Sequence, residues 1–145
     1  MVGGKAQIFD SDLLKLIFNA TPIVNIADNA SVSPLTNLYF SLHLSDPGIG
    51  GNQTTQESVY TSYTRIAVPR SAMGFIVSGN SCSLAAPVAF PIATGGYGEV
   101  DTFFAVGTAF TGTGKILYRG PLVPSVTIAA GLAPTLTTGT TVTEN

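Results

Sequence analysis

The sequence predicts a mainly β fold, either a β-sandwich or a small barrel, with one helix near its N-terminus. Two observations predict it. From residue 37 onward, short apolar or alternating segments recur at roughly 8–12-residue intervals, which is the strand spacing of sandwiches and barrels. Turn-forming glycines and prolines separate these segments. The 145 residues suit one domain over residues 1–145, because a chain of this size buries roughly 70% of its unfolded surface.

The helix is expected over about residues 10–20. Asp10 and Ser11 are both competent N-caps. Pro22 disfavours helical geometry at the residue before it, so the helix should end there. Residues 25–30 fit one more helical turn. Apolar side chains at spacings of three and four form a stripe along the helix, namely Phe9, Leu13, Leu14, Ile17 and Phe18.

The strand pattern is clearest just after this helical region. Leu38, Phe40 and Leu42 alternate with more polar residues, which predicts an apolar core face and an outer face that carries His43. An Asp-Pro-Gly turn at residues 46–48 ends the strand. Further strands are expected over residues 60–68, 74–78, 81–84, 88–92, 100–106, 115–118, 123–129 and 135–142.

Charge is scarce along the whole sequence. Charged residues make up 10% of the chain, against a typical value of about 25%. The apolar runs are much shorter than the roughly 20 residues of a membrane-spanning helix, and the basic residues are scattered and form no cluster for nucleic acid. We therefore expect neither a membrane nor a nucleic-acid partner. A sparsely charged surface fits a subunit that other proteins cover in an assembly.

The residues that catalysis or metal binding would need are few. The one histidine, His43, and the one cysteine, Cys82, are too few for a zinc site, and we interpret His43 as a solvent-facing or interface residue. Glu99 and Asp101 would lie on one face of a strand at roughly 6.5–7 Å. We interpret that face, which includes Phe103, as a polar outer surface and not as a glycosidase pair. We expect no catalytic residue, no metal and no cofactor.

Five stretches of the chain resemble one known family. They are residues 12–21 (DLLKLIFNAT), 33–39 (SPLTNLY), 41–48 (SLHLSDPG), 63–68 (YTRIAV) and 114–118 (GKILY). The family consists of small virion proteins of tailed bacteriophages, which are often labelled tail fibre proteins. The resemblance runs over nearly the whole chain, and it implies a jelly-roll-like β-domain without catalytic residues.

Members of this kind from short-tailed phages resemble capsid cement, or decoration, proteins. The resemblance implies a structural virion protein on the outer surface of the capsid, whose partner is the assembled lattice of the major capsid protein. Binding the shell but not its free subunits would stabilise the shell by mass action. Self-association would let one unit bridge two capsomers, and the dimer is the commonest closed homo-oligomer. A single cysteine and a start without an apolar signal favour synthesis in the host cytoplasm.

Contacts with partners are expected in three places: the N-terminal segment 2–18, the loop 46–58 and the outer strand face. Wide, weakly charged contact surfaces would serve a protein whose value lies in the area it covers. The side chains expected to make these contacts are Phe9, Leu13, Ile17, Ile49 and Phe103.

Three other functions stay open at this point. The main alternative to capsid cement is a tail or tail-fibre component that contacts the host or an adaptor protein. A carbohydrate-binding module would stack sugars on aromatic side chains, and the chain has five tyrosines but no tryptophan. An enzyme is the last alternative, because the sequence provides no recognisable catalytic set.

Overall fold

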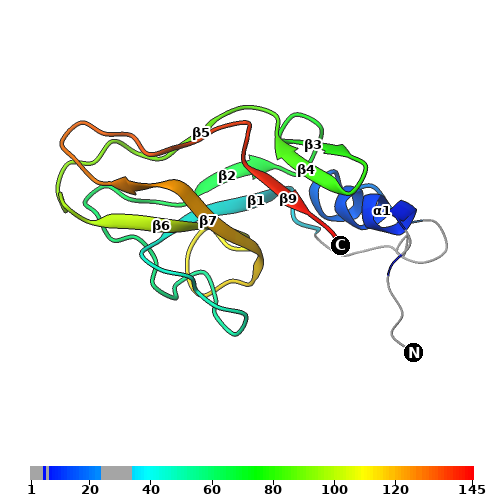
Figure 1. Cartoon of the computed structure of the whole chain (residues 1–145), viewed down its shortest axis with the longest axis horizontal. Helices are drawn as coiled ribbons and strands as arrows, with labels where there is room; N and C mark the ends of the chain where they lie inside the picture. Colours follow the sequence, from blue (N-terminus) through cyan, green and yellow to red (C-terminus); the bar gives the residue numbers. More distant parts are fainter. Residues whose placement is uncertain (1–4, 6, 24–33) are drawn as a thin grey trace. The chain divides into compact units, whose positions relative to one another are not determined.

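The structure is a computed structural model that describes residue 5 and residues 7–23 and 34–145 (Figure 1). Among these residues there are one helix and nine strands, and no sheet closes into a barrel. The prediction of a mainly β fold with an N-terminal helix is confirmed, and the arrangement is consistent with a β-sandwich. The helical turn expected at 25–30 lies outside the described residues. The elements are α1 (Gln7–Phe18), β1 (Asn37–His43), β2 (Ile66–Pro69), β3 (Phe75–Ser78), β4 (Ser81–Leu84), β5 (Val88–Ala89), β6 (Val100–Gly107), β7 (Ile116–Thr127), β8 (Thr135–Leu136) and β9 (Thr141–Thr143).

The chain divides into two compact units. The first contains the described residues of 1–36, 69–87 and 136–145, and the second contains residues 37–68 and 88–135. The strands form a sheet with the order β2-β1-β6-β7, a sheet with the order β3-β4-β9, and a two-stranded β5-β8 pair. That residues 1–145 fold as a single domain stays a prediction.

The helix α1 begins earlier than the sequence predicts. It starts at Gln7, so Asp10 is not its N-cap but lies in its first turn, where a carboxylate interacts favourably with the helix dipole. The helix ends at Phe18, and Ala20 beyond it adopts a left-handed conformation with a φ of 52°. This conformation stops the helix before Pro22, as expected.

In the first unit, α1 packs against β3 and β4. The ring of Phe18 lies 4.8 Å from the ring of Phe75, measured between centroids. Arg70 holds the end of the helix, because its guanidinium donates to the carbonyls of Leu16 and Ile17 at 2.8 Å each. A cation at this position also interacts favourably with the C-terminal end of the helix dipole.

The second unit is built on the four-stranded sheet, with β1 and β6 as its central, antiparallel strands. Phe40 lies opposite Val106, and Leu42 lies opposite Phe104. All four side chains are buried, so the alternation along β1 correctly predicts the core face. The rings of Phe40 and Phe104 stack with their centroids 6.3 Å apart.

The outer strand β7 is one strand of 12 residues, whereas the sequence predicts two strands and a turn. It is the last strand in the sheet order, where Pro121 removes no hydrogen bond from a central ladder. Between two of its pairs with β6, β7 carries residues 122–125 where β6 has only Thr102. The strand therefore bulges outward, and Val123 in the bulge is 88% exposed.

Three other predicted strands are shorter or divided in the structure, namely 60–68, 88–92 and 135–142. Only the end of the first forms β2, because the Tyr63 amide donates to the Tyr60 carbonyl at 3.0 Å and closes a turn. Only the start of the second forms β5. The third divides into β8 and β9 around a turn at residues 137–140.

Candidate functional site

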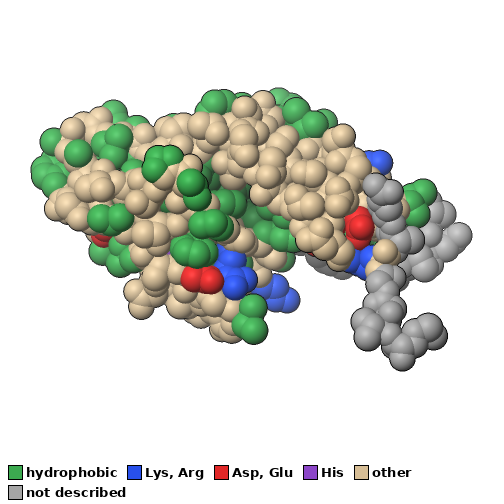
Figure 2. Space-filling view, viewed as in Figure 1, with side chains coloured by type: hydrophobic (Ala, Val, Ile, Leu, Met, Phe, Trp, Pro, Cys, Tyr) green, Lys and Arg blue, Asp and Glu red, His purple; other side chains and the backbone are tan. Residues whose placement is uncertain are grey.

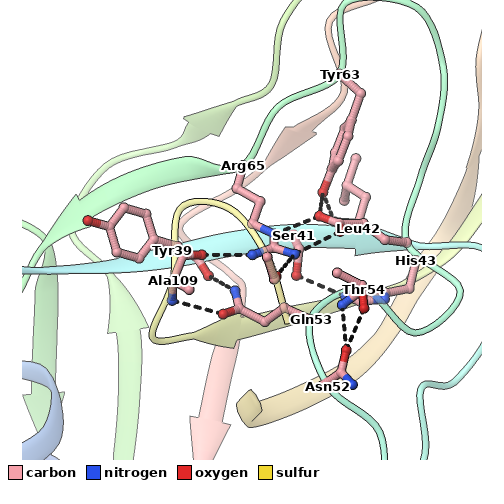
Figure 3. A network of polar contacts seen from close by, with 12 residues as sticks. Tyr39, Ser41, Leu42, His43, Asn52, Gln53, Thr54, Tyr63, Arg65 and Ala109 are labelled. Carbon is pink, nitrogen blue, oxygen red and sulfur yellow. Dashed lines mark hydrogen bonds and ion pairs between the residues drawn. The ribbon is translucent and has the colours of Figure 1, made fainter. Parts of the chain in front are cut away.

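The second face of β1 and β6, opposite the apolar core face, carries a layer of buried polar side chains, part of which Figure 3 shows. Ser41 and His43 of β1 and Asp101 of β6 each have an exposed fraction of 0%. Phe103, directly across from His43, is half-buried. The predictions that His43 faces solvent or an interface, and that Asp101 belongs to an outer surface, are therefore wrong.

The cover is the loop that follows β1, residues 44–58. Its last residues return alongside the end of the strand, where the Ser58 amide donates to the Leu42 carbonyl at 2.9 Å. The Leu44 amide donates to the Gln56 carbonyl at 2.7 Å. An alternating sequence indicates which side chains share a face, but it does not indicate that a loop will cover that face.

His43 makes two hydrogen bonds. Its Nδ1 donates to the Thr55 carbonyl at 2.8 Å, because a carbonyl oxygen can only accept. In the neutral ring, its Nε2 then accepts from the Ser41 hydroxyl, also at 2.8 Å. Burial lowers the pKa of His43, since the charged ring would lose its hydration. The Nδ1 contact therefore holds the loop on the strand, and the Nε2 contact, within β1, fixes the orientation of the ring.

Gln53 joins this loop to the connection between β6 and β7 (Figure 3). Its side chain is fully buried. The Oε1 atom accepts from the Ala109 amide at 2.9 Å, and the Nε2 atom donates to the Tyr39 carbonyl at 3.4 Å. The backbone amide of Gln53 donates to the Thr113 carbonyl at 2.8 Å. A polar side chain is thus buried with each of its groups hydrogen-bonded.

A buried ion pair joins the same segments. The Arg65 guanidinium donates to both carboxylate oxygens of Glu57, at 2.7 and 2.8 Å. Two further donors reach the carbonyls of Ala109 and Gly112, at 2.9 and 2.8 Å. The Tyr63 hydroxyl donates to Glu57 at 2.9 Å. Both charged groups therefore have hydrogen-bond partners besides each other, which helps to offset the cost of burying an ion pair.

The two carboxyl groups singled out in the sequence, Glu99 and Asp101, are joined by the hydroxyl of Ser58. The Ser58 Oγ lies 2.5 Å from Glu99 Oε1 and 3.1 Å from Asp101 Oδ2. Burial and the nearby Glu99 charge raise the pKa of Asp101 to about 6. Ser58 is itself 2% exposed and Asp101 is 0% exposed, so Glu99, which is half-buried, is the member of this cluster that solvent reaches.

The described residues contain no group of three or more metal-ligating side chains. Cys82 is buried, and desolvation raises the pKa of its thiol to about 12. A thiol that stays protonated is a poor nucleophile and a poor metal ligand. In the same part of the chain, no helix combines the length and the apolar character that crossing a membrane would require.

Many of the charged side chains among the described residues form ion pairs with one another. Arg65 pairs with Glu57, and Arg119 pairs with Asp46 at 2.5 Å. Lys5 contacts Asp10 and Glu144. On the face shown in Figure 2, charged side chains are few and lie among apolar and uncharged polar ones. Contacts made by such a surface depend on shape and apolar area more than on charge.

The expected contact residues differ in how far they are exposed. Ile49 is 97% exposed and Phe9 is 37% exposed. Leu13, Ile17 and Phe103 are half-buried. The contact role of these residues stays a prediction. Several other large apolar side chains are exposed although the sequence pattern does not single them out, among them Ile8, Val59, Met73 and Val123.

A comparison with protein families shows which family the chain belongs to. Residues 18–144 match the model of the family described as podophage GP4 fiber I protein gp80. The chain belongs to this family. No curated protein matches the chain. The match identifies the protein as a structural protein of short-tailed phage virions and confirms the coarse part of the resemblance noted in the sequence.

The gp80 family match includes the whole polar layer between β1 and the loop 44–58. It begins at residue 18 and so leaves out nearly all of α1, where Phe9, Leu13 and Ile17 lie. The family description names a fibre protein, which agrees with the tail-fibre alternative. It says nothing of a capsid cement role or of attachment to the outer surface of the capsid.

Proposed function

We propose that this protein is a fibre component of a short-tailed phage particle and that it works by surface contact, without catalysis. The printed name of the matching family supports the fibre assignment. The second unit supports the mode of action, because its polar side chains are used inside the fold to hold loops in place. Its apolar side chains are the groups that remain for contacts with partners.

The observation that carries this proposal is the fixed position of Ile49. The loop tip is closed by the Gly48 amide, which donates to the Asp46 carboxylate at 2.8 Å, and by the Gly51 amide, which donates to the Gly48 carbonyl at 3.3 Å. Arg119 holds Asp46 from β7. A 97% exposed isoleucine on such a braced tip loses little conformational entropy when it binds.

Capsid cement is the second candidate function. The scarcity of free charge favours it, because a weakly charged surface suits permanent burial against the major capsid protein lattice. Self-association, with a dimer as the first expectation, belongs to this proposal as well. Sedimentation of the purified protein at several concentrations would test the oligomeric state directly.

The location of the protein in its own particle separates the two candidates. A cryo-EM map of the particle, together with the copy number relative to the major capsid protein, is the decisive measurement. We expect density for the chain in appendages at the tail and a copy number far below that of the capsid protein. Density that follows the capsid lattice, with copies in proportion to the capsid protein, would overturn the fibre proposal in favour of cement.

A further inference from the structure

The hydroxyl of Ser58 contacts a carboxyl oxygen of Glu99 and one of Asp101. If both carboxyls are ionised, there is one hydroxyl hydrogen for these two contacts. The Ser58 hydroxyl lies within bonding distance of Glu99 Oε1 and of Asp101 Oδ2. A hydroxyl has a single hydrogen, so it can donate to only one of them. Two ionised carboxylates would leave the other contact without a proton.

The surroundings indicate which carboxyl is ionised. Glu99 also receives the Val59 amide, which lies 3.2 Å from each of its carboxylate oxygens. Asp101 is 0% exposed, and its Oδ1 has no hydrogen-bond partner among the described residues. Hydrogen bonds to a carboxylate favour its charged form, whereas burial without partners favours the neutral form. Asp101 is thus the carboxyl that carries the proton.

The other titratable groups near Asp101 do not supply a compensating positive charge. Tyr60, on the segment that carries Ser58, donates its hydroxyl to the Pro91 carbonyl. On β1 the nearest such group is His43, a neutral ring already bound to Ser41 and Thr55. On β7, Tyr118 lies opposite Val106, and Arg119 is paired with Asp46.

We propose that Asp101 and Glu99 share one proton through Ser58 and that this proton latches the segment 58–59 onto β6. Asp101 Oδ2–H donates to Ser58 Oγ, and Ser58 Oγ–H donates to Glu99 Oε1. Loss of the proton leaves two carboxylates facing one hydroxyl, so one contact is broken and the buried charge repels Glu99. The latch is therefore closed in acid and already loosened at neutral pH.

The sign of the pH effect follows from the direction of the shift. The pKa of Asp101 is raised from 3.8 to about 6 in the folded chain. The folded chain therefore holds its proton more tightly than the unfolded chain does. The stability that this proton contributes is complete below the unfolded pKa and is lost as the pH rises to the folded pKa.

Two measurements on the full chain test the latch. The first is a titration of the side-chain carboxyl carbons by NMR over roughly pH 4 to pH 8. We expect the Asp101 signal to titrate near the raised pKa of about 6. The second is the melting temperature of Asp101→Asn against that of the natural chain over the same range, because an asparagine amide can donate to Ser58 as the protonated acid does.

We expect Asp101→Asn to gain in melting temperature relative to the natural chain as the pH rises. The matched control is Asp46→Asn at an exposed ion pair, where Arg119 lowers the pKa of Asp46. This control should stay nearly constant over the range, because a pKa lowered from 3.8 puts the loss of its stabilisation at more acidic pH. An Asp101 signal that titrates at its ordinary value overturns the proposal, and so does a pH-independent difference between Asp101→Asn and the natural chain. If the variant does not fold, the titration of the natural chain decides alone.

Discussion

Arg65 and Glu57 form a two-point ion pair in which the arginine side chain is only 4% exposed. Removing one partner would leave the other charge buried without compensation, which typically costs about 3–5 kcal/mol. We therefore expect Arg65→Met to lower the free energy of unfolding by about this amount in urea unfolding experiments, although methionine fills a similar volume.

The matched control for this prediction is Arg119→Met. Its ion pair with Asp46 is much more exposed, with side-chain exposed fractions of 29% and 45%. Exposed pairs contribute about 0–1 kcal/mol, so this variant should stay close to the natural chain. Equal losses in the two variants would mean that the buried pair has no special importance for the fold.

His43 should make the protein sensitive to acid. Its folded pKa is lowered from 6.5 by burial, so below that pH the unfolded chain binds a proton that the folded chain resists. Stability from this group is therefore present above pH 6.5 and is lost as the pH falls. We expect His43→Asn to cost about 1–3 kcal/mol at neutral pH through lost hydrogen bonding.

The measurement is the difference in unfolding free energy between His43→Asn and the natural chain at several pH values. This difference should shrink as the pH falls, because only the natural chain carries the acid penalty. Taking the difference cancels the opposite contribution of Asp101, which both proteins share. A difference that stays constant with pH would rule out a buried neutral ring.

Gly107 leaves space for the buried side chain of Gln53. A Cβ atom at this position would lie 2.3 Å from the Gln53 Cδ and 2.6 Å from the Lys115 carbonyl oxygen. Because the second neighbour is backbone, Gly107→Ala cannot be accommodated by moving one side chain. We expect it to lower the free energy of unfolding by about 1–3 kcal/mol. Gly50→Ala, with nothing within 4 Å, is the control and should change it little.

Ile49 should affect binding and not folding. We expect Ile49→Ser to change the free energy of unfolding by no more than about 0.5 kcal/mol, as is usual for surface positions. The same substitution should weaken binding to particles that lack the protein, measured by co-sedimentation. Met73→Ser, at another exposed apolar side chain (82%), is the control. Equal binding by both variants and the natural chain would remove Ile49 from the contact surface.

The core face of the sheet could be predicted from the sequence, but its polar face could not. Leu38, Phe40 and Leu42 alternate as expected and are buried. The same alternation wrongly places His43 outside, because it carries no information on residues 44–58, which are polar and lack a strand pattern. The covering loop is held by side-chain contacts between distant residues, and a local pattern cannot record these.

The breaks in the strands show a similar limit. The local sequence around Pro121 predicts a turn, yet Pro121 lies within β7. A proline is tolerated there because β7 is the last strand in its sheet. The position of a strand in a sheet depends on pairings across the chain. The carboxyl pair is a further example, since Glu99 and Asp101 were noticed by their spacing but Ser58, which joins them, had no signal of its own.

Pro121 has a consequence for how neighbouring copies of this chain behave. It has no N–H group, so its pairing with Phe103 requires that its nitrogen point away from β6, toward the free side of the sheet. A strand from an adjacent copy would find no donor there. An added strand would therefore lose a hydrogen bond at this position, which makes this edge of the sheet a poorer template for pairing with a second chain.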